Sequence, residues 1–301
     1  MNMKDKGKRA KKGKTKRILV TGGTGFVGKV LVENLSKSYS IRVFARKNAV
    51  IKNAEIFVGN LLDEKDVEKS LEGMDIVIHL AAMMSGNEKE IYSFNIKSTE
   101  NLVNASIKGK IKKFIFLSSE NAMWPGQSAY GESKKRCEEI VKKLNGCLIL
   151  RSSAIYGKGS SIILGKAIDY VKKSKIIAIP GNGKSLMQPI YIEDVADYII
   201  NGVKYNAKGT YTIAGSSKIS FNEFVDTAAG ILKVKRIKIH IPLWIIFPIM
   251  PVIKAIFKNP PIKPSQIKNL NTTRTYDIGK AVKGLKHIPL KIKEGLKKTL
   301  I

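Results

Sequence analysis

The sequence has few cysteines and histidines, the residues that form disulfides in small folds and bind metals. It contains two cysteines, Cys137 and Cys147, and three histidines in 301 residues. Two thiols are too few for a disulfide framework or a four-cysteine zinc site, and three widely separated histidines offer no metal-ligand spacing. We therefore expect no metal. We also expect a cytoplasmic protein of a reducing compartment, whose chain is long enough to bury a full core.

Acidic residues are also scarce, since 24 Asp and Glu oppose 54 Lys and Arg to give a net charge of +30. Residues 1–17 carry +8 and residues 233–301 carry +14, so the middle of the chain carries only +8. We interpret residues 1–16 as a disordered basic arm without the apolar region of a secretory signal. The arm is either a solubilising tail or a contact with an anionic surface, lipid or RNA. Because no motif of a nucleic-acid-binding fold is present, we do not expect a nucleic-acid partner.

Long hydrophobic runs are absent as well. Residues 239–253 contain no Asp, Glu, Lys or Arg, but 15 residues are too few to span a bilayer, and three prolines interrupt them. We expect a buried or substrate-facing helix. Peripheral membrane contact is the alternative, because basic residues flank the segment. These are Lys235, Arg236, Lys238, Lys254 and Lys258.

From Arg17 onward, short apolar runs alternate with amphipathic stretches, a pattern typical of repeated βα units. The pattern predicts an α/β fold, a Rossmann-type doubly wound parallel sheet with a smaller, mainly C-terminal substrate-binding lobe. We place the nucleotide-binding domain at 17–180 and most of the lobe at 181–301, with a helix at 193–204 packing back on the first domain. The expected strands are residues 17–22, 41–45, 55–59, 75–81, 112–119, 146–152 and 175–180.

The first expected strand is followed by a glycine-rich loop, TGGTGFVG at residues 21–28. Glycines in this pattern allow a tight turn and a close approach of the backbone to a pyrophosphate, which then meets the N-terminus of the next helix. Its place between a strand and an amphipathic helix makes the signal strong. The expected cofactor-binding residues of the loop are Gly22, Gly23, Thr24, Gly25, Phe26, Val27 and Gly28.

The end of the second strand indicates which nicotinamide cofactor binds. A carboxylate at this position accepts a hydrogen bond from the ribose 2′-hydroxyl of NAD, whereas an arginine binds the 2′-phosphate of NADP. Here the sequence reads Arg46-Lys47, with no carboxylate. We predict NADP(H) as the preferred cofactor, with NAD(H) as the alternative.

Tyr130 and Lys134 lie four residues apart and so share one face of a helix. A nearby ammonium lowers the pKa of a phenol, which can then exchange a proton with a substrate hydroxyl or carbonyl. The spacing recurs at Tyr276 and Lys280, but only Tyr130 follows a strand that ends in Ser118-Ser119.

At these motifs the chain resembles an extended or atypical short-chain dehydrogenase/reductase of the NAD-dependent epimerase/dehydratase family. The resemblance covers about residues 17–300 and includes VIHLAA (77–82), YGESK (130–134) and PIYIEDVADYI (189–199). It implies an NAD(P)-dependent oxidoreductase or epimerase with Ser119, Tyr130 and Lys134 as catalytic residues. It also implies that further residues lie near the cofactor, namely Asn60, Leu61, Ala81, Ala82, Asn95 and Ser118.

The resemblance leaves the substrate open. Nucleotide-sugar epimerases of this family carry an Arg-Asp pair where this chain has Met187 and Gln188. We therefore predict hydride transfer at a secondary alcohol or ketone, of a nucleotide sugar or of a more apolar, lipid-like molecule. The alternative is a non-catalytic NADPH-binding accessory protein of a membrane complex, but the chain retains Tyr130 and Lys134, which atypical members often lose. A homodimer is a further expectation from the resemblance.

Overall fold

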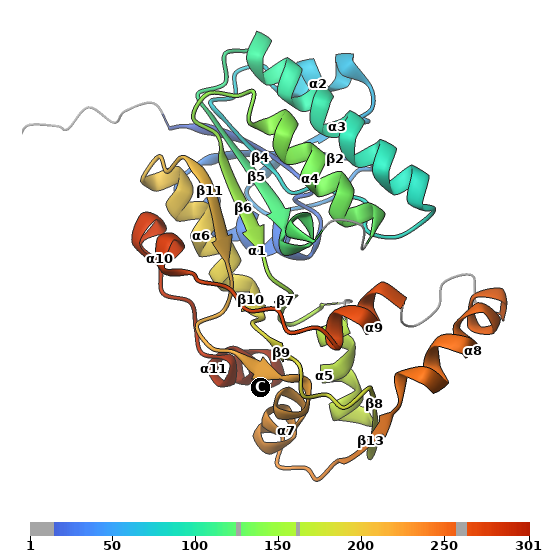
Figure 1. Cartoon of the computed structure of the whole chain (residues 1–301). Helices are drawn as coiled ribbons and strands as arrows, with labels where there is room; N and C mark the ends of the chain where they lie inside the picture. Colours follow the sequence, from blue (N-terminus) through green and yellow to red (C-terminus); the bar gives the residue numbers. More distant parts are fainter. Residues whose placement is uncertain (1–14, 125–127, 161–162, 257–263) are drawn as a thin grey trace, which may run out of the picture.

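The fold is described from a computed structural model of the chain, which covers residues 15–124, 128–160, 163–256 and 264–301. Residues 1–14 of the expected basic arm, and Lys258 beside the apolar segment, lie outside the described residues. The molecule has an upper part built on a large sheet and a lower part of short strands and helices (Figure 1).

Seven parallel strands form the large sheet, in the order β11-β6-β5-β4-β1-β2-β3. The order reverses beside β1, which is typical of a doubly wound sheet and confirms the predicted fold class. The strands are β1 (Arg17–Thr21), β2 (Ser40–Ala45), β3 (Ala54–Val58), β4 (Ile76–His79), β5 (Lys113–Ser119), β6 (Leu148–Ser152) and β11 (Gly209–Ile213).

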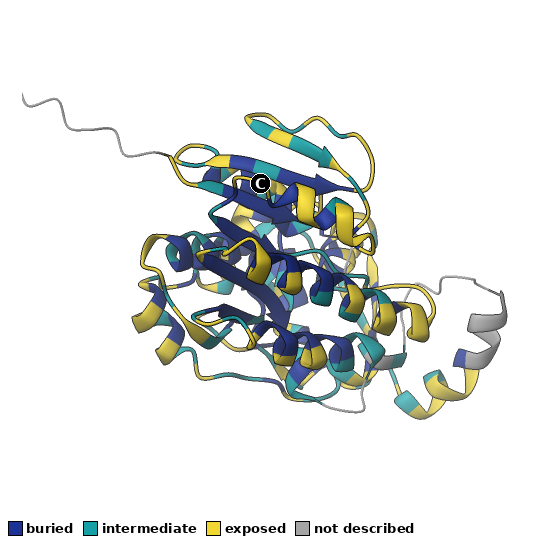
Figure 2. Ribbon diagram, turned by 90° about the horizontal axis from the view of Figure 1, so that it is seen from above, coloured by how far each residue is buried: buried dark blue, intermediate teal, exposed yellow. Residues whose placement is uncertain are grey.

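Helices cover both faces of this sheet (Figures 1 and 2). The central strands β4 and β5 are buried along their whole length, as parallel strands between two helical layers must be. Successive side chains alternate between the two cores, so Ile18 and Val20 join one core while Leu19 and Val77 join the other. One layer holds α1 (Phe26–Leu35) and α6 (Ile192–Lys204), and the other holds α2 (Glu64–Ser70), α3 (Glu88–Lys108) and α4 (Ala129–Val141).

The lower part of the molecule is built from short strands that pair two by two, and from helices. It contains β7 (Ile155–Tyr156), β8 (Ile176–Pro180), β9 (Leu186–Met187), β10 (Ile190–Tyr191), β12 (Ile219–Ser220) and β13 (Ile237–Ile241). Its helices are α5 (Ile163–Lys173), α7 (Phe221–Ile231), α8 (Leu243–Ile256), α9 (Pro264–Leu270) and α11 (Ile292–Leu300), whereas α10 (Gly279–Leu285) packs against β11 and α6 of the upper part. A short 3₁₀ helix, η1 (Glu120–Met123), follows β5.

The strands depart from the predicted division at residue 180 in two places. The run at 175–180 forms β8, which pairs with β13 in the lower part instead of joining the main sheet. Conversely, β11 pairs in parallel with β6 and becomes the seventh strand. An apolar run has the same appearance in a central strand and in a ribbon with one buried face, so the sequence alone did not distinguish them.

Candidate active site

A cavity of about 740 Å³ lies at the carboxyl ends of the central strands, between the upper and lower parts. It brings together residues that are far apart in the sequence, which is the arrangement expected of an active site. The predicted residues that line it are Gly22, Thr24, Gly25, Phe26, Val27, Gly28, Arg46, Asn60, Leu61, Ala81, Ala82, Ser118, Ser119, Tyr130 and Lys134.

The glycine-rich loop has the geometry of a phosphate cradle. A Cβ atom on Gly28 would lie 2.1 Å from the carbonyl oxygen of Gly22, and one on Gly22 would lie 2.7 Å from the amide nitrogen of Ala81. Helix α1 begins after Gly25, with no side-chain cap and no acidic residue in its first turn. Its free N–H groups and dipole therefore suit the pyrophosphate of a dinucleotide.

Arg46 follows β2 and lines the same cavity. Its side chain is exposed, and within the described part of the chain it forms no ion pair. Asn60 takes the corresponding place after β3, so the predicted adenosine end of the cavity has no acidic side chain from these two strand ends. Lys47, beside Arg46, does not line the cavity, and neither does Gly23, where an added Cβ atom would lie 2.7 Å from the Val43 side chain.

Ser119, Tyr130 and Lys134 converge on the cavity from the end of β5 and the first turns of α4. Burial raises the pKa of the Tyr130 phenol, and a hydrogen bond with Ser119 opposes that rise. Burial lowers the pKa of Lys134 to about 8. The Lys134 ammonium donates to the carbonyl oxygen of Leu117 at 2.8 Å and lies 5.9 Å from the centre of the Tyr130 ring.

His79 is buried behind this triad and takes no place in the cavity lining. Its Nδ1 lies 2.6 Å from the Thr21 hydroxyl, and its Nε2 lies 3.1 Å from the Thr99 hydroxyl. Burial and the nearby Lys134 lower the pKa of His79 to about 3. The imidazole is therefore neutral at physiological pH and holds β1 and α3 together.

Of two further predicted residues, Asn95 acts on the cavity through its neighbours and Ser118 lines it. The Asn95 amide brackets the backbone of Met83, accepting from its N–H at 2.7 Å and donating to its carbonyl at 3.1 Å. Asn95 thereby fixes the loop after β4 without lining the cavity. The Ser118 hydroxyl donates to Glu138 at 2.6 Å, and Glu138 is paired with Arg151.

A polar network adjoins the triad and was not predicted from the sequence: the Asn121 side chain, which donates to the Ser119 hydroxyl at 3.2 Å, connects the two. Arg274 is buried, donates to Asn121 at 3.0 Å and to Asn269 at 2.7 Å, and lies 4.0 Å from the Glu120 carboxylate. Burial raises the pKa of Glu120, which accepts a hydrogen bond from Tyr276. Glu120 directly follows Ser119 at a strand end, which was a usable signal, but no local motif marked Arg274.

The second Tyr-Lys spacing does not form a catalytic pair. The Tyr276 hydroxyl is engaged with Glu120, whereas Lys280 donates to the carbonyl oxygen of Thr210 at 3.0 Å. The two side chains serve different contacts, and Lys280 does not line the cavity. Context thus separates Tyr130 from Tyr276, as the sequence analysis predicted.

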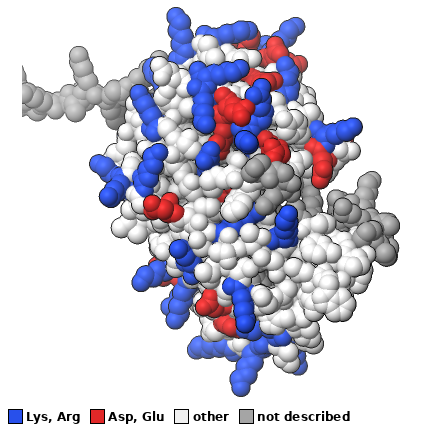
Figure 3. All heavy atoms as spheres, viewed as in Figure 1, with Lys and Arg blue, Asp and Glu red and all other residues white. Residues whose placement is uncertain are grey.

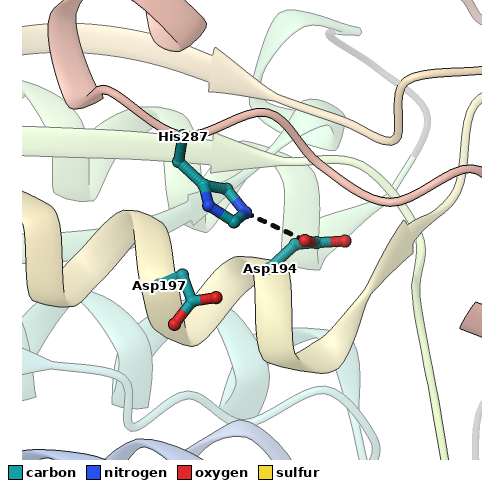
Figure 4. A group of neighbouring side chains, drawn as sticks. All are labelled: Asp194, Asp197 and His287. Atoms are coloured by element: carbon teal, nitrogen blue, oxygen red, sulfur yellow. Dashed lines mark hydrogen bonds and ion pairs between the residues drawn. The ribbon is translucent and has the colours of Figure 1, made fainter. Parts of the chain in front are cut away.

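A cluster of one histidine and two aspartates lies away from the cavity, on α6 and the segment after α10 (Figure 4). His287 Nε2 lies 2.9 Å from Asp194, whose other carboxylate oxygen accepts from the Leu290 N–H at 3.1 Å. Asp197 lies beside them, and burial raises the pKa of its carboxyl group. Both carboxylate oxygens of Asp194 thus form hydrogen bonds with the segment after α10 and hold this C-terminal segment on α6.

The family and the sequence relatives agree with one another. The model of the 3-beta hydroxysteroid dehydrogenase/isomerase family matches residues 19–217. The chain is 26% identical to 3beta-hydroxysteroid-dehydrogenase/decarboxylase isoform 2 of Arabidopsis thaliana, over 94% of the chain and 61% of that protein. It is 25% identical to the bovine sterol-4-alpha-carboxylate 3-dehydrogenase, decarboxylating, over 92% of the chain and 89% of the relative. The chain therefore spans about three fifths of the length of the Arabidopsis relative.

Solved structures share the fold. The chain aligns with UDP-glucuronic acid 4-epimerase from Bacillus cereus in complex with NAD at a TM-score of 0.76 and 20% identity, covering 94% of the chain and 97% of the epimerase. At this identity the likeness establishes the fold alone. Family, relatives and fold are those of enzymes of the extended short-chain dehydrogenase/reductase type, as the motifs predicted.

Proposed function

The chain belongs to the 3-beta hydroxysteroid dehydrogenase/isomerase family, and from this premise we propose that it oxidises a secondary alcohol on an apolar, fused-ring substrate, with NADP⁺ as the preferred acceptor. The observation that carries the proposal is the convergence of Ser119, Tyr130 and Lys134 on the cavity that also contains the glycine-rich loop. The bound nicotinamide would accept or donate the hydride.

The triad's own contribution is to hold the reacting oxygen and move its proton. Ser119 and Tyr130 would each hydrogen-bond the substrate hydroxyl, and Tyr130 would take its proton as the carbonyl forms. The positive charge of Lys134 favours the phenolate form of Tyr130. Because Lys134 is buried and its pKa is about 8, this charge is sensitive to the hydrogen bonds that it makes inside the cavity.

The remaining cavity wall supports an apolar substrate with one polar attachment. Apolar side chains come from the loop after β4 and from α3, α5, β9 and α9, while Arg274 supplies a buried cation. A fused-ring alcohol would fill the apolar wall, and Arg274 would receive a carboxylate on it. The apolar lining residues are Met83, Met84, Phe94, Ile163, Leu164, Met187 and Leu270.

The proposed cofactor preference rests on Arg46. Its exposed guanidinium lines the cavity after β2, where a bidentate contact with a 2′-phosphate would be made. We also propose that the protein meets membranes peripherally, where an apolar substrate would be found.

A matrix of initial rates tests substrate and cofactor together. The substrates are a 3β-hydroxysteroid, the same steroid with a 4-carboxylate, and UDP-glucose, each with NADP⁺ or NAD⁺. We expect the steroids with NADP⁺ to give the highest kcat/KM, and Arg46→Ala to reduce the preference for NADP⁺ at least about tenfold, because charge-assisted hydrogen bonds contribute roughly 1.5–3 kcal/mol. Turnover of UDP-glucose alone would contradict the substrate class, and a wild-type preference for NAD⁺ would contradict the role of Arg46.

A further inference from the structure

The lower part of the molecule exposes a continuous apolar surface. In the β8–β13 ribbon Ile176 lies opposite Ile237, and Ile239 follows on the same face because side chains alternate along a strand. Helix α8 begins after β13, and Trp244 and Phe247, three residues apart and so on one side of the helix, extend the face. The five residues Ile176, Ile237, Ile239, Trp244 and Phe247, here called the α8 surface, are between 41% and 76% exposed.

The position of α8 corrects the expectation of a buried or substrate-facing helix. The helix projects from the body of the molecule (Figure 1), Trp244 is 76% exposed, and none of the helix side chains that the structure describes lines the active-site cavity. Among its described side chains only Met250 is buried. A monomeric protein rarely leaves so large an apolar face to water, so the α8 surface indicates a partner.

The charge around the α8 surface indicates what that partner is. Residues 227–273 contain eight Lys and Arg and no Asp or Glu, and one of them, Lys238, is paired with Asp226. Register places Lys175 beside Arg236 at the start of the ribbon, and the Arg236 guanidinium donates to the carbonyl oxygens of Val171 and Lys172. In Figure 3 the lower right of the molecule is uncharged and Lys and Arg gather along the lower rim. An apolar face with a basic margin is complementary to an anionic lipid interface.

We propose that the α8 surface docks the protein on an anionic phospholipid bilayer, with Trp244 and Phe247 in the interface. The helix would lie in the interfacial region, because no helix in the described part of the chain is long and apolar enough to cross a membrane. Tryptophan is enriched in the interfacial region of membranes, and the prolines of α8 are compatible with a helix that does not cross the bilayer.

The same surface is linked to the active site, and this step rests on the proposed function. The next described helix along the chain, α9, contributes Gln266, Asn269 and Leu270 to the cavity lining. The docked helix and one wall of the cavity are therefore consecutive described helices of the chain.

Co-sedimentation of the full-length chain with vesicles tests the docking without any turnover. Vesicles of phosphatidylcholine are compared with vesicles that contain about 30% phosphatidylserine. We expect binding to the anionic vesicles, a blue shift of the tryptophan emission, and at least tenfold weaker binding of W244S/F247S. The matched control is Ile288→Ser, since Ile288 is also 76% exposed but lies away from the α8 surface.

NADPH binding, measured on each variant, shows that the cavity is folded. Equal vesicle binding by wild type and W244S/F247S would overturn the proposal, as would absence of binding to both vesicle types. A dimer in solution that W244S/F247S dissociates would instead assign the surface to a second copy of the chain. Steroid turnover in detergent, measured separately, distinguishes a failure of docking from a failure of the proposed function.

Discussion

At the scale of single residues, the site depends on ionisable groups whose burial determines their charge. Lys134 lines the cavity and His79 lies buried behind it, and burial lowers the pKa of each. Their roles differ because of what they contact. Lys134 reaches the Leu117 carbonyl and the Tyr130 ring, whereas His79 is enclosed by two threonine hydroxyls. The histidine therefore joins β4 to β1 and α3 behind Lys134.

The low pKa of His79 predicts acid sensitivity of the fold. Between pH 6.5 and 3 the unfolded chain binds a proton at this residue and the folded chain does not, so the free energy of unfolding falls as pH falls. From pH 7 to 5 the loss amounts to about 2 kcal/mol. We expect His79→Gln, which does not titrate, to lose about 2 kcal/mol less than wild type over this interval in urea unfolding. Equal pH dependence of the two proteins would show that His79 protonates freely in the folded state.

At the scale of helices and strands, α6 joins the two parts of the molecule. One side of α6 packs against the main sheet. Asp194 on the same helix accepts hydrogen bonds from the His287 ring and from the Leu290 N–H. Asp197, one turn later, accepts no hydrogen bond among the described residues. The two aspartates of Figure 4 thus have different structural roles.

This difference predicts unequal effects of two similar substitutions. Asp194→Ala leaves two donors without their acceptor and should lower the free energy of unfolding by roughly 2–4 kcal/mol. Asp197→Ala is the matched control and should change it by less than about 0.5 kcal/mol. Denaturant titrations of both variants measure the comparison. Equal losses would mean that Asp194 does not fasten the C-terminal segment to α6.

Six of the seven strands of the main sheet, and the meeting of Ser119, Tyr130 and Lys134 at one cavity, could be predicted because their signals are local. The expected strand at 112–119 corresponds to β5 (Lys113–Ser119), and the helix at 193–204 to α6. The Arg274–Glu120 contact could not be predicted, because it joins residues far apart in the sequence through tertiary packing. The exposure of α8 could not be predicted from the sequence either, because an apolar run has the same composition whether it is buried or exposed.

At the scale of the whole molecule, most of the excess positive charge lies in other parts of the chain than those that form the cavity. The cavity lies between the main sheet and the lower part, while the basic excess gathers in the C-terminal third and in the first 17 residues. If both proposals hold, the chain would bind a phosphate-bearing cofactor in its interior and an anionic bilayer on its exterior. The homodimer stays a prediction.

Comparison of wild type with Tyr130→Phe tests the central claim, that Tyr130 moves the proton while hydride passes between a secondary alcohol and the nicotinamide. NADPH formation from NADP⁺ and a 3β-hydroxysteroid is followed at the nicotinamide absorbance, and NADPH affinity is measured by titration. We predict that the variant loses turnover by about 10²–10⁴-fold, as expected for a lost acid–base group, and retains its affinity for NADPH. Turnover of Tyr130→Phe at the wild-type rate would contradict the claim.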